Sequence, residues 1–144
     1  MAQAQSTRAR LAIPIHGILG AYPLVCFTAA LITDLAYADT AEMQWANFSV
    51  WLIAGGVAMG VIAAIAGVVD AMVTRARRQA RSWHSVLTII MLITAIINGF
   101  IHSRDAWTSV VPSGLVLSVI TSILALVTSW LGYSAAALPR TEAA

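Results

Sequence analysis

The sequence predicts an all-α integral membrane protein that folds as a four-helix up-down bundle. Of its 144 residues, 60% are hydrophobic and only 10% are charged, a balance unlike that of water-soluble domains. A bilayer core about 30 Å thick needs roughly 20 apolar residues per helix, so this chain accommodates about four spans with little left over. We therefore expect residues 1–144 to form a single transmembrane domain.

Four spans are expected, at about residues 12–36, 47–73, 84–103 and 111–136. Each should be helical, because lipid offers backbone groups no other hydrogen-bond partners. The short connections favour an up-down-up-down order in which sequential helices are neighbours. The first span also resembles a signal peptide, but its apolar run is too long for one and ends in Asp34, so we expect no cleavage.

The arginines predict the orientation of the spans. With four spans, the N-terminus, the loop at 75–81 and the C-terminal tail lie on one side, and only Arg104 lies on the other. By the positive-inside rule both termini are cytoplasmic. This clustering at helix ends argues against nucleic-acid binding. Lysine is absent, which excludes Schiff-base chemistry on lysine.

Stripes of small or polar residues predict the inward faces of the spans. The second span has a small face at Gly56, Gly60 and Gly67, which serves tight helix packing or, more rarely, a flat cofactor. Lipid-facing surfaces should be uniformly apolar, so the polar stripes of the other spans should also turn inward. These stripes are His16, Gly20, Pro23, Phe27, Ala30 and Asp34 in the first span, His84, Thr88, Met91, Ala95, Asn98 and His102 in the third, and Ser118, Ser122, Ala125 and Ser129 in the fourth.

Two histidines are expected at the same depth near the cytoplasmic side. His16 precedes Asp34 by 18 residues and His84 precedes His102 by 18, which is roughly 27 Å along each of two helices that run in the same direction. In a bundle whose first and third helices lie diagonally, the two imidazoles could hold one haem b from opposite sides. The alternative is that each histidine lies in the membrane interface without a ligand.

The loop after the second span offers partners for such a haem. Its guanidinium groups, Arg75, Arg77, Arg78 and Arg81, could bind the haem propionates. Asp70 lies near the same depth and could orient an imidazole, although a salt bridge to the arginine loop is the favoured role.

The opposite end carries a second group of polar residues. His102 and Arg104 could join Asp34 and Glu42 in an ion-pair or quinone-binding rim. A Met43–His102 pair is conceivable, and a solvated helix end is the simplest alternative. No fourth histidine is available to make a second bis-histidine haem site here.

Several motifs resemble one family of bacterial membrane proteins. They are "H-x5-Y-P" at His16, Tyr22 and Pro23, then Asp34, "GVVD" ending at Asp70, His84, Arg104, and "SWLG" at 129–132. Together they resemble the family catalogued as domain of unknown function 2231, over about residues 12 to 133. The resemblance implies a four-span protein of the bacterial inner (plasma) membrane. Relatives often have His-Pro in place of His16-Gly17, sometimes carry another histidine in place of Ala21, and some occur beside or fused to redox proteins.

These observations lead to one favoured function and two alternatives. The favoured one is a small cytochrome b-like protein with one haem b between His16 and His84, which exchanges electrons with a quinone or a redox protein. The alternatives are a non-catalytic structural or accessory subunit and a proton or small-solute carrier that uses Asp34, Asp70 and the histidines. No conventional catalytic motif is present. The lipid bilayer is the certain partner, and a homo-oligomer is compatible with the small-residue faces.

Overall fold

Four helices make up the part of the chain that the structure describes. The computed structural model describes the backbone of residues 2–74, 78–104 and 109–137, and the side chains of 18–69, 72, 83–104 and 109–134. Helix α1 comprises Ala2–Thr40, α2 Met43–Thr74, α3 Arg78–His102 and α4 Ser113–Ala137. No strand occurs within these residues, and the predicted all-α class is confirmed.

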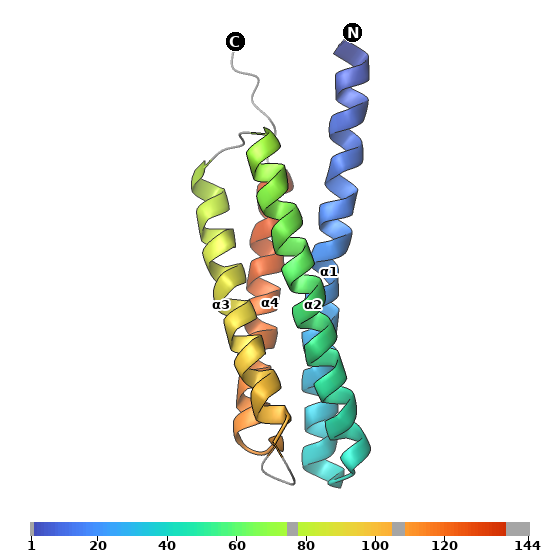
Figure 1. The fold of residues 1–144 in the computed structure, drawn as a ribbon, viewed down its shortest axis with the longest axis vertical. Coiled ribbons are helices and arrows are strands. Elements are labelled where there is room, and N and C mark those ends of the chain that lie inside the picture. The colour runs from blue at the N-terminus through green and yellow to red at the C-terminus, as the bar shows by residue number, and fades with distance from the viewer. Residues whose placement is uncertain (1, 75–77, 105–108, 138–144) are drawn as a thin grey trace.

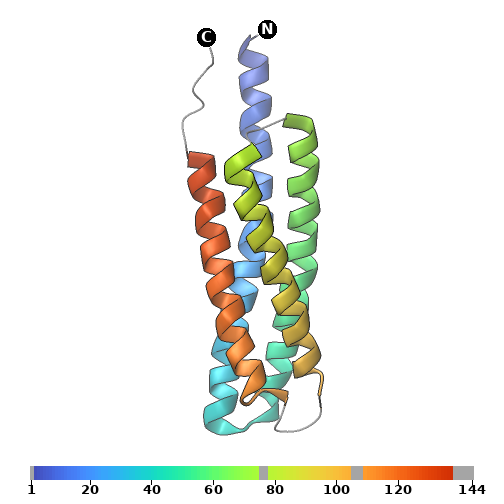
Figure 2. The same cartoon turned by 90° about the vertical axis from the view of Figure 1, so that its left-hand side faces the viewer.

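The helices run up, down, up and down, as Figures 1 and 2 show. Residues Ala41 and Glu42 alone separate α1 from α2. Ala41 has a positive φ of 56°, and its N–H donates to the carbonyl of Tyr37 at 2.8 Å, which closes the last turn of α1. The main contacts link α1 to α2, α2 to α3, α3 to α4, and α4 back to α1. Sequential helices are therefore neighbours, as predicted, and α1 and α3 lie diagonally across the bundle.

Each helix contains an apolar segment long enough to cross a bilayer. These segments are Ile18–Thr40, Met43–Val69, Trp83–His102 and Ser113–Ser134, close to the predicted spans where side chains are described. Large apolar residues cover the outer faces, including Trp51, Phe100 and Trp130. Such a surface suits lipid and would be costly in water.

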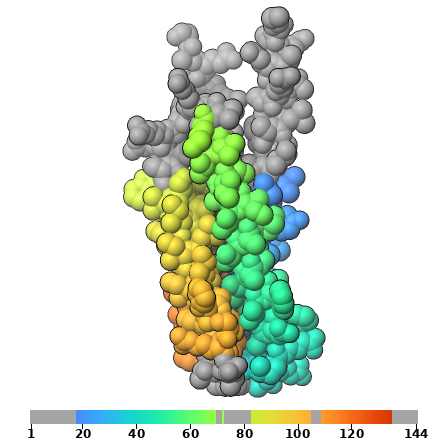
Figure 3. All heavy atoms as spheres, in the orientation of Figure 1, coloured from blue at the N-terminus to red at the C-terminus, as the bar shows by residue number. Residues whose placement is uncertain are grey.

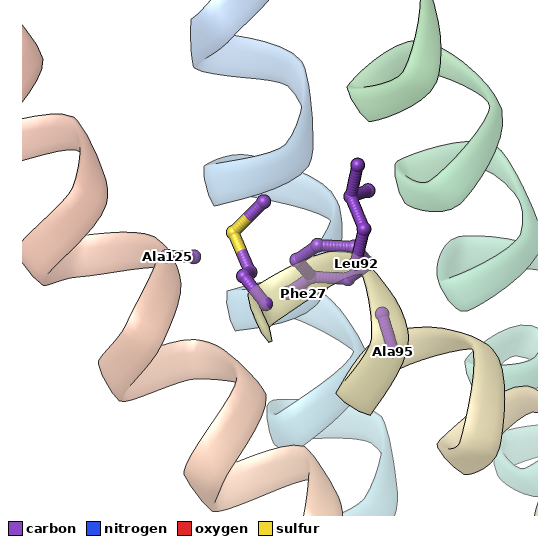
Figure 4. Close-up of a cluster of buried hydrophobic side chains, with 5 residues drawn as sticks. Phe27, Leu92, Ala95 and Ala125 are labelled. Atoms are coloured by element: carbon purple, nitrogen blue, oxygen red, sulfur yellow. The ribbon is translucent and has the colours of Figure 1, made fainter. Parts of the chain in front are cut away.

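A small apolar core fills the middle of the bundle. Figure 4 shows Phe27 of α1 beside Leu92 and Ala95 of α3 and Ala125 of α4, and all four side chains are buried. Helix α2 approaches this core through glycines. A Cβ at Gly56 would lie 2.5 Å from Phe27 Cε1, and one at Gly60 would lie 2.7 Å from Leu92 Cδ2. At both positions the glycine face therefore serves close helix packing.

The predicted polar stripes turn inward where side chains are described. Pro23, Phe27, Ala30 and Asp34 are buried on α1, and Met91, Ala95, Asn98 and His102 on α3. Ser118, Ser122 and Ala125 are buried on α4. Since these stripes meet in the bundle interior, most of the polar groups of α1, α3 and α4 are available only to one another.

Candidate functional site

A carboxylate and an imidazole meet across the bundle interior near the α1–α2 turn. His102 Nε2 of α3 lies 2.9 Å from Asp34 Oδ1 of α1, although 68 residues separate them in the chain. Asp34 is 0% exposed and His102 is 4% exposed. Ionisable groups buried within membrane spans are rare and usually functional, so this pair is the leading candidate for a site.

Two further buried side chains complete the hydrogen bonding of the carboxylate. Ser118 Oγ of α4 donates to Asp34 Oδ2 at 2.5 Å, and Asn98 Nδ2 of α3 donates to Ser118 Oγ at 2.8 Å. His102 Nδ1 lies 3.0 Å from the backbone carbonyl oxygen of Asn98, one turn earlier in α3. We call Asp34, Asn98, His102 and Ser118 the polar cluster. It joins α1, α3 and α4.

Helical periodicity places each member of the polar cluster. Asn98 and His102 are four residues apart and share a face of α3, while Ser118 lies one turn after Gly114 on α4. A Cβ at Gly114 would lie 2.7 Å from His102 Cε1 and 2.8 Å from the carbonyl oxygen of Ser109. Glycine at this position therefore allows the imidazole to lie against the start of α4.

The hydrogen-bond roles fix the number of protons in the cluster. A carbonyl oxygen only accepts, so Nδ1 of His102 must carry a proton to bond with Asn98 O. The contact between Nε2 and Asp34 Oδ1 then needs one more proton, on the imidazole or on the carboxyl. Both arrangements are neutral overall, which makes burial of the pair tolerable. The pair therefore shares one removable proton.

A groove leads to His102 from the end of the bundle where α1 and α2 connect. The groove has a volume of about 420 Å³. Its walls are Met43, Gln44, Ala46, Asn47 and Val50 of α2, together with His102, Arg104 and Ser109. His102 is thus the residue of the polar cluster that lines the groove, while its side chain is fully buried.

The groove and cluster refine the rim expected from the sequence. Asp34 was expected on the inward face near the end of the first span, and its carboxylate does lie within the bundle, on an α1 that continues to Thr40. His102 meets it there, while Arg104 and Glu42 are exposed. Met43 lines the same groove and accepts a hydrogen bond on Sδ from the Tyr37 hydroxyl at 3.9 Å.

Sequence reasoning did not identify Ser118 as a partner of Asp34. The available signal was the pair of serines four residues apart, Ser118 and Ser122, on the otherwise apolar α4. That pattern indicated an inward face, but it did not indicate which group on another helix each serine would meet.

His84 lies at the other end of α3, in contact with α4. Its Nδ1 is 3.1 Å from the backbone carbonyl oxygen of Thr128 and therefore donates to it. A Cβ at Gly132 would lie 3.1 Å from His84 Cε1, so the imidazole packs closely against this glycine. The Thr128 hydroxyl is buried and has no hydrogen-bond partner among the described residues.

The remaining candidates lie mostly outside the described side chains. Arg75 and Arg77 lie outside the described residues altogether. The side chains of His16, Asp70, Arg78 and Arg81 are likewise outside the description, although their backbones belong to helices. Gly67 is partly buried on α2.

The fold and the polar cluster define a class: a four-span helical membrane protein with a buried acid–histidine pair. The family described as "Predicted membrane protein (DUF2231)" matches residues 12–141. The chain belongs to this family, as its motifs indicated. No curated protein and no solved structure matches the chain.

Proposed function

We propose that the protein binds and releases a proton at Asp34 and His102 within the membrane. The observation that supports this proposal is the hydrogen bond of His102 Nδ1 to Asn98 O, which leaves one shared proton between Nε2 and Asp34 Oδ1. A structural role would be met as well by uncharged residues, whereas an acid and an imidazole in contact are two groups that can each hold the shared proton. This is the proton-carrier alternative that the sequence raised, with Asp34 and His102 as its centre.

Two hydrogen bonds of the polar cluster would remain after that proton is released, although the contact between His102 Nε2 and Asp34 Oδ1 would lose its proton. After release, the Asp34 carboxylate would still accept from Ser118, whose hydroxyl would still accept from Asn98 Nδ2. Hydrogen bonds to the ionised form of a carboxylate stabilise it. The serine and asparagine would therefore support the deprotonated state.

Infrared and NMR titrations test this proposal in lipid nanodiscs. The carboxyl bands assigned to Asp34 and the ¹⁵N shifts of His102 should change together at one pH, with release of one proton. Asp34→Asn should abolish the carboxyl change and move the pH at which the His102 ¹⁵N shifts change. Asp39→Asn is the matched control, because Asp39 is an exposed carboxylate on the same helix and should leave them unaltered. If neither group changes while the protein stays folded, the pair is structural and the proposal is wrong.

A haem b between His16 and His84 is the second candidate, and the environment of His84 favours it. Histidines that ligate a metal through Nε2 usually donate Nδ1–H to a carboxylate or backbone carbonyl, as His84 does to Thr128. The contact between Asp34 and His102 places these two residues at the same level of α1 and α3. His16 and His84 each precede them by 18 residues, so their backbones should also lie at similar levels. Such a haem would give a cytochrome b-like protein that exchanges electrons with a quinone or redox protein.

The arginines around the α2–α3 connection would serve this haem. Arg75, Arg77, Arg78 and Arg81 would pair with its propionates, and Asp70 would orient an imidazole. With cytoplasmic termini in a bacterial inner membrane, this end of the bundle would face the cytoplasm.

Visible absorption spectra of protein purified from haem-replete cells test the second candidate. Oxidised and dithionite-reduced samples should show a Soret band and sharp α and β bands, and either His16→Ala or His84→Ala should remove them. The matched control is His102→Ala, which should keep these bands because His102 is bonded to Asp34 at the other end. A wild-type protein without haem bands, despite adequate haem supply, would rule the candidate out.

A further inference from the structure

The polar cluster lies between two apolar layers of the bundle interior. One layer is the core that contains Phe27, which precedes Asp34 on α1 by seven residues, or about 10 Å. The other layer consists of Tyr37, Ala46 and Val110, which are all buried. Tyr37 follows Asp34 by three residues, or about 4.5 Å, so this second layer is the nearer one. We call it the end layer.

The end layer separates the polar cluster from the nearer end of the bundle. Helix α1 ends at Thr40, six residues or about 9 Å beyond Asp34. In the other direction its apolar segment continues for 16 residues, or about 24 Å, to Ile18. The outer faces of the helices carry large apolar residues that suit lipid. Water that reaches the pair of Asp34 and His102 by the shortest route therefore crosses the end layer.

The groove of about 420 Å³ adjoins the end layer. Figure 3 shows α2, in green to teal, beside α3, in yellow to orange, and the groove residues belong to the start of α2, the end of α3 and the residues that follow α3. Ala46 belongs both to the end layer and to the groove wall, and Ser109, next to Val110, also lines the groove. The exposed side chains of Asn47 and Arg104 make the wall polar, so the groove suits water.

Val110 is the member of the end layer that is best placed to move. Tyr37 and Ala46 belong to the long helices α1 and α2, whereas Val110 lies in the connection between α3 and α4 and belongs to neither helix. Its carbonyl oxygen accepts from the N–H of Leu115 at 2.8 Å, which ties the connection to the first turn of α4. Connections open locally at a lower free energy than packed helices do. Local opening at Val110 therefore requires no separation of the helices.

The same connection covers the imidazole of His102. A Cβ at Gly114 would lie 2.7 Å from His102 Cε1 and 2.8 Å from Ser109 O, so the ring and the Ser109 backbone pack against the same point of α4. Both His102 and Ser109 are groove residues, and the side chain of His102 is fully buried. Displacement of Ser109 and Val110 would therefore uncover the imidazole on the side of the groove.

We propose that Val110 is a gate, and that local opening of the connection that carries it admits water from the groove to Asp34 and His102. The proposal rests on the proton-binding function of this pair, and it names the route between the pair and water. In the closed form both imidazole nitrogens are hydrogen-bonded inside the bundle and the pair keeps its proton. In the open form the pair gives its proton to a water molecule and becomes singly negative, and the reverse step restores it. The rate of exchange therefore follows the population of the open form.

Hydrogen–deuterium exchange at the ring nitrogens of His102 tests this inference. After transfer of the protein in lipid nanodiscs into D₂O at one pH, NMR measures the rate at which the ring N–H signals disappear. Val110→Ala opens a gap in the end layer and should speed this exchange at least tenfold. Val110→Thr keeps the size of the side chain and adds a hydroxyl to the layer. It should speed exchange severalfold, and it decides the question if Val110→Ala does not fold.

Val57→Ala is the matched control for Val110→Ala. It makes the same truncation in a valine packed against the core on the other side of the polar cluster, so it should change the exchange rate less than twofold. The backbone N–H of Ala95, which is buried in that core, reports opening of the whole bundle and should exchange at the wild-type rate in every variant.

Two results would overturn the gate. One is a ring exchange rate within twofold of wild type in the folded Val110 variants. The other is an equal acceleration in Val57→Ala or at Ala95, which would show general loosening of the bundle. The equilibrium titration of Asp34 and His102 does not depend on the gate. A pair that fails to titrate therefore refutes the proton-binding function, whereas a normal titration with unchanged exchange refutes the gate alone.

Discussion

Replacing Asp34 by asparagine and by alanine separates a proton-bearing pair from a fixed ion pair. Asparagine has the shape of a protonated aspartate. Its amide can donate to His102 Nε2, and its carbonyl oxygen can accept from Ser118 Oγ, so both contacts of Asp34 survive. Alanine removes both contacts and leaves the imidazole nitrogen and the hydroxyl buried without them.

The structure sets the size of the difference between the two variants. Each buried polar group that loses its partner costs about 1–3 kcal/mol. The imidazole of His102 and the hydroxyl of Ser118 both lose a partner in Asp34→Ala, so this variant should lose about 2–6 kcal/mol of unfolding free energy. Asp34→Asn keeps both hydrogen bonds. It should cost less than about 1 kcal/mol of unfolding free energy, because neutral hydrogen bonds of the asparagine amide replace neutral hydrogen bonds of a protonated carboxyl. The two variants should therefore differ severalfold in destabilisation.

Denaturant titration in mixed detergent micelles, followed by tryptophan fluorescence, measures these free energies. Asp39→Asn, at an exposed position of α1, controls for the loss of a carboxylate as such. If Asp34→Asn destabilises the protein as much as Asp34→Ala, the native pair is held by its charges. The shared proton would then lie on the imidazole, and the expectation that the Asp34 carboxyl holds it would be refuted.

Three further predictions concern the packing and the turn that position the polar cluster. Gly56→Ala should lower the unfolding free energy by about 1–3 kcal/mol through overpacking, whereas the adjacent Gly55→Ala, with nothing within 4 Å, should be neutral or slightly stabilising. Denaturant titration of the two variants measures these changes, and equal losses of unfolding free energy in Gly56→Ala and Gly55→Ala would contradict the close packing at Gly56. Gly114→Ala should displace the imidazole of His102 and shift its ¹⁵N resonances, and unchanged resonances would contradict the close approach. Ala41→Gly should raise stability by up to about 1 kcal/mol because the positive φ suits glycine, and a loss would contradict it.

The sequence was sufficient to predict the four spans and the orientation of their faces. Apolar runs of about 20 residues and the three- and four-residue spacing of polar residues are local properties, and lipid enforces the helix on each run. The inward placement of Asp34, Asn98 and His102 followed from that spacing. Helix ends were less accurate: α1 extends to Thr40 rather than 36, because Ala41 adopts a left-handed conformation and closes one more turn.

The candidate site was only half predictable. Asp34 and His102 were expected at the same end of the bundle, as part of an ion-pair or quinone-binding rim. The sequence did not determine that Asp34 is fully buried or that Ser118 binds its second oxygen. The haem ligands expected at His16 and His84 remain a prediction, since the side chain of His16 lies outside the described residues.

By itself, the sequence determined that this is a four-span helical membrane protein and which side of most spans faces inward. These properties depend on hydrophobicity and helical period, which each segment carries alone. Only the tertiary structure decided which inward residues touch. That depends on the rotation and register of helices distant in the chain, fixed by close approaches at Gly56, Gly60 and Gly114. Those contacts bring a carboxylate on α1 within 2.9 Å of an imidazole on α3, and they convert two isolated polar residues into one neutral, buried pair.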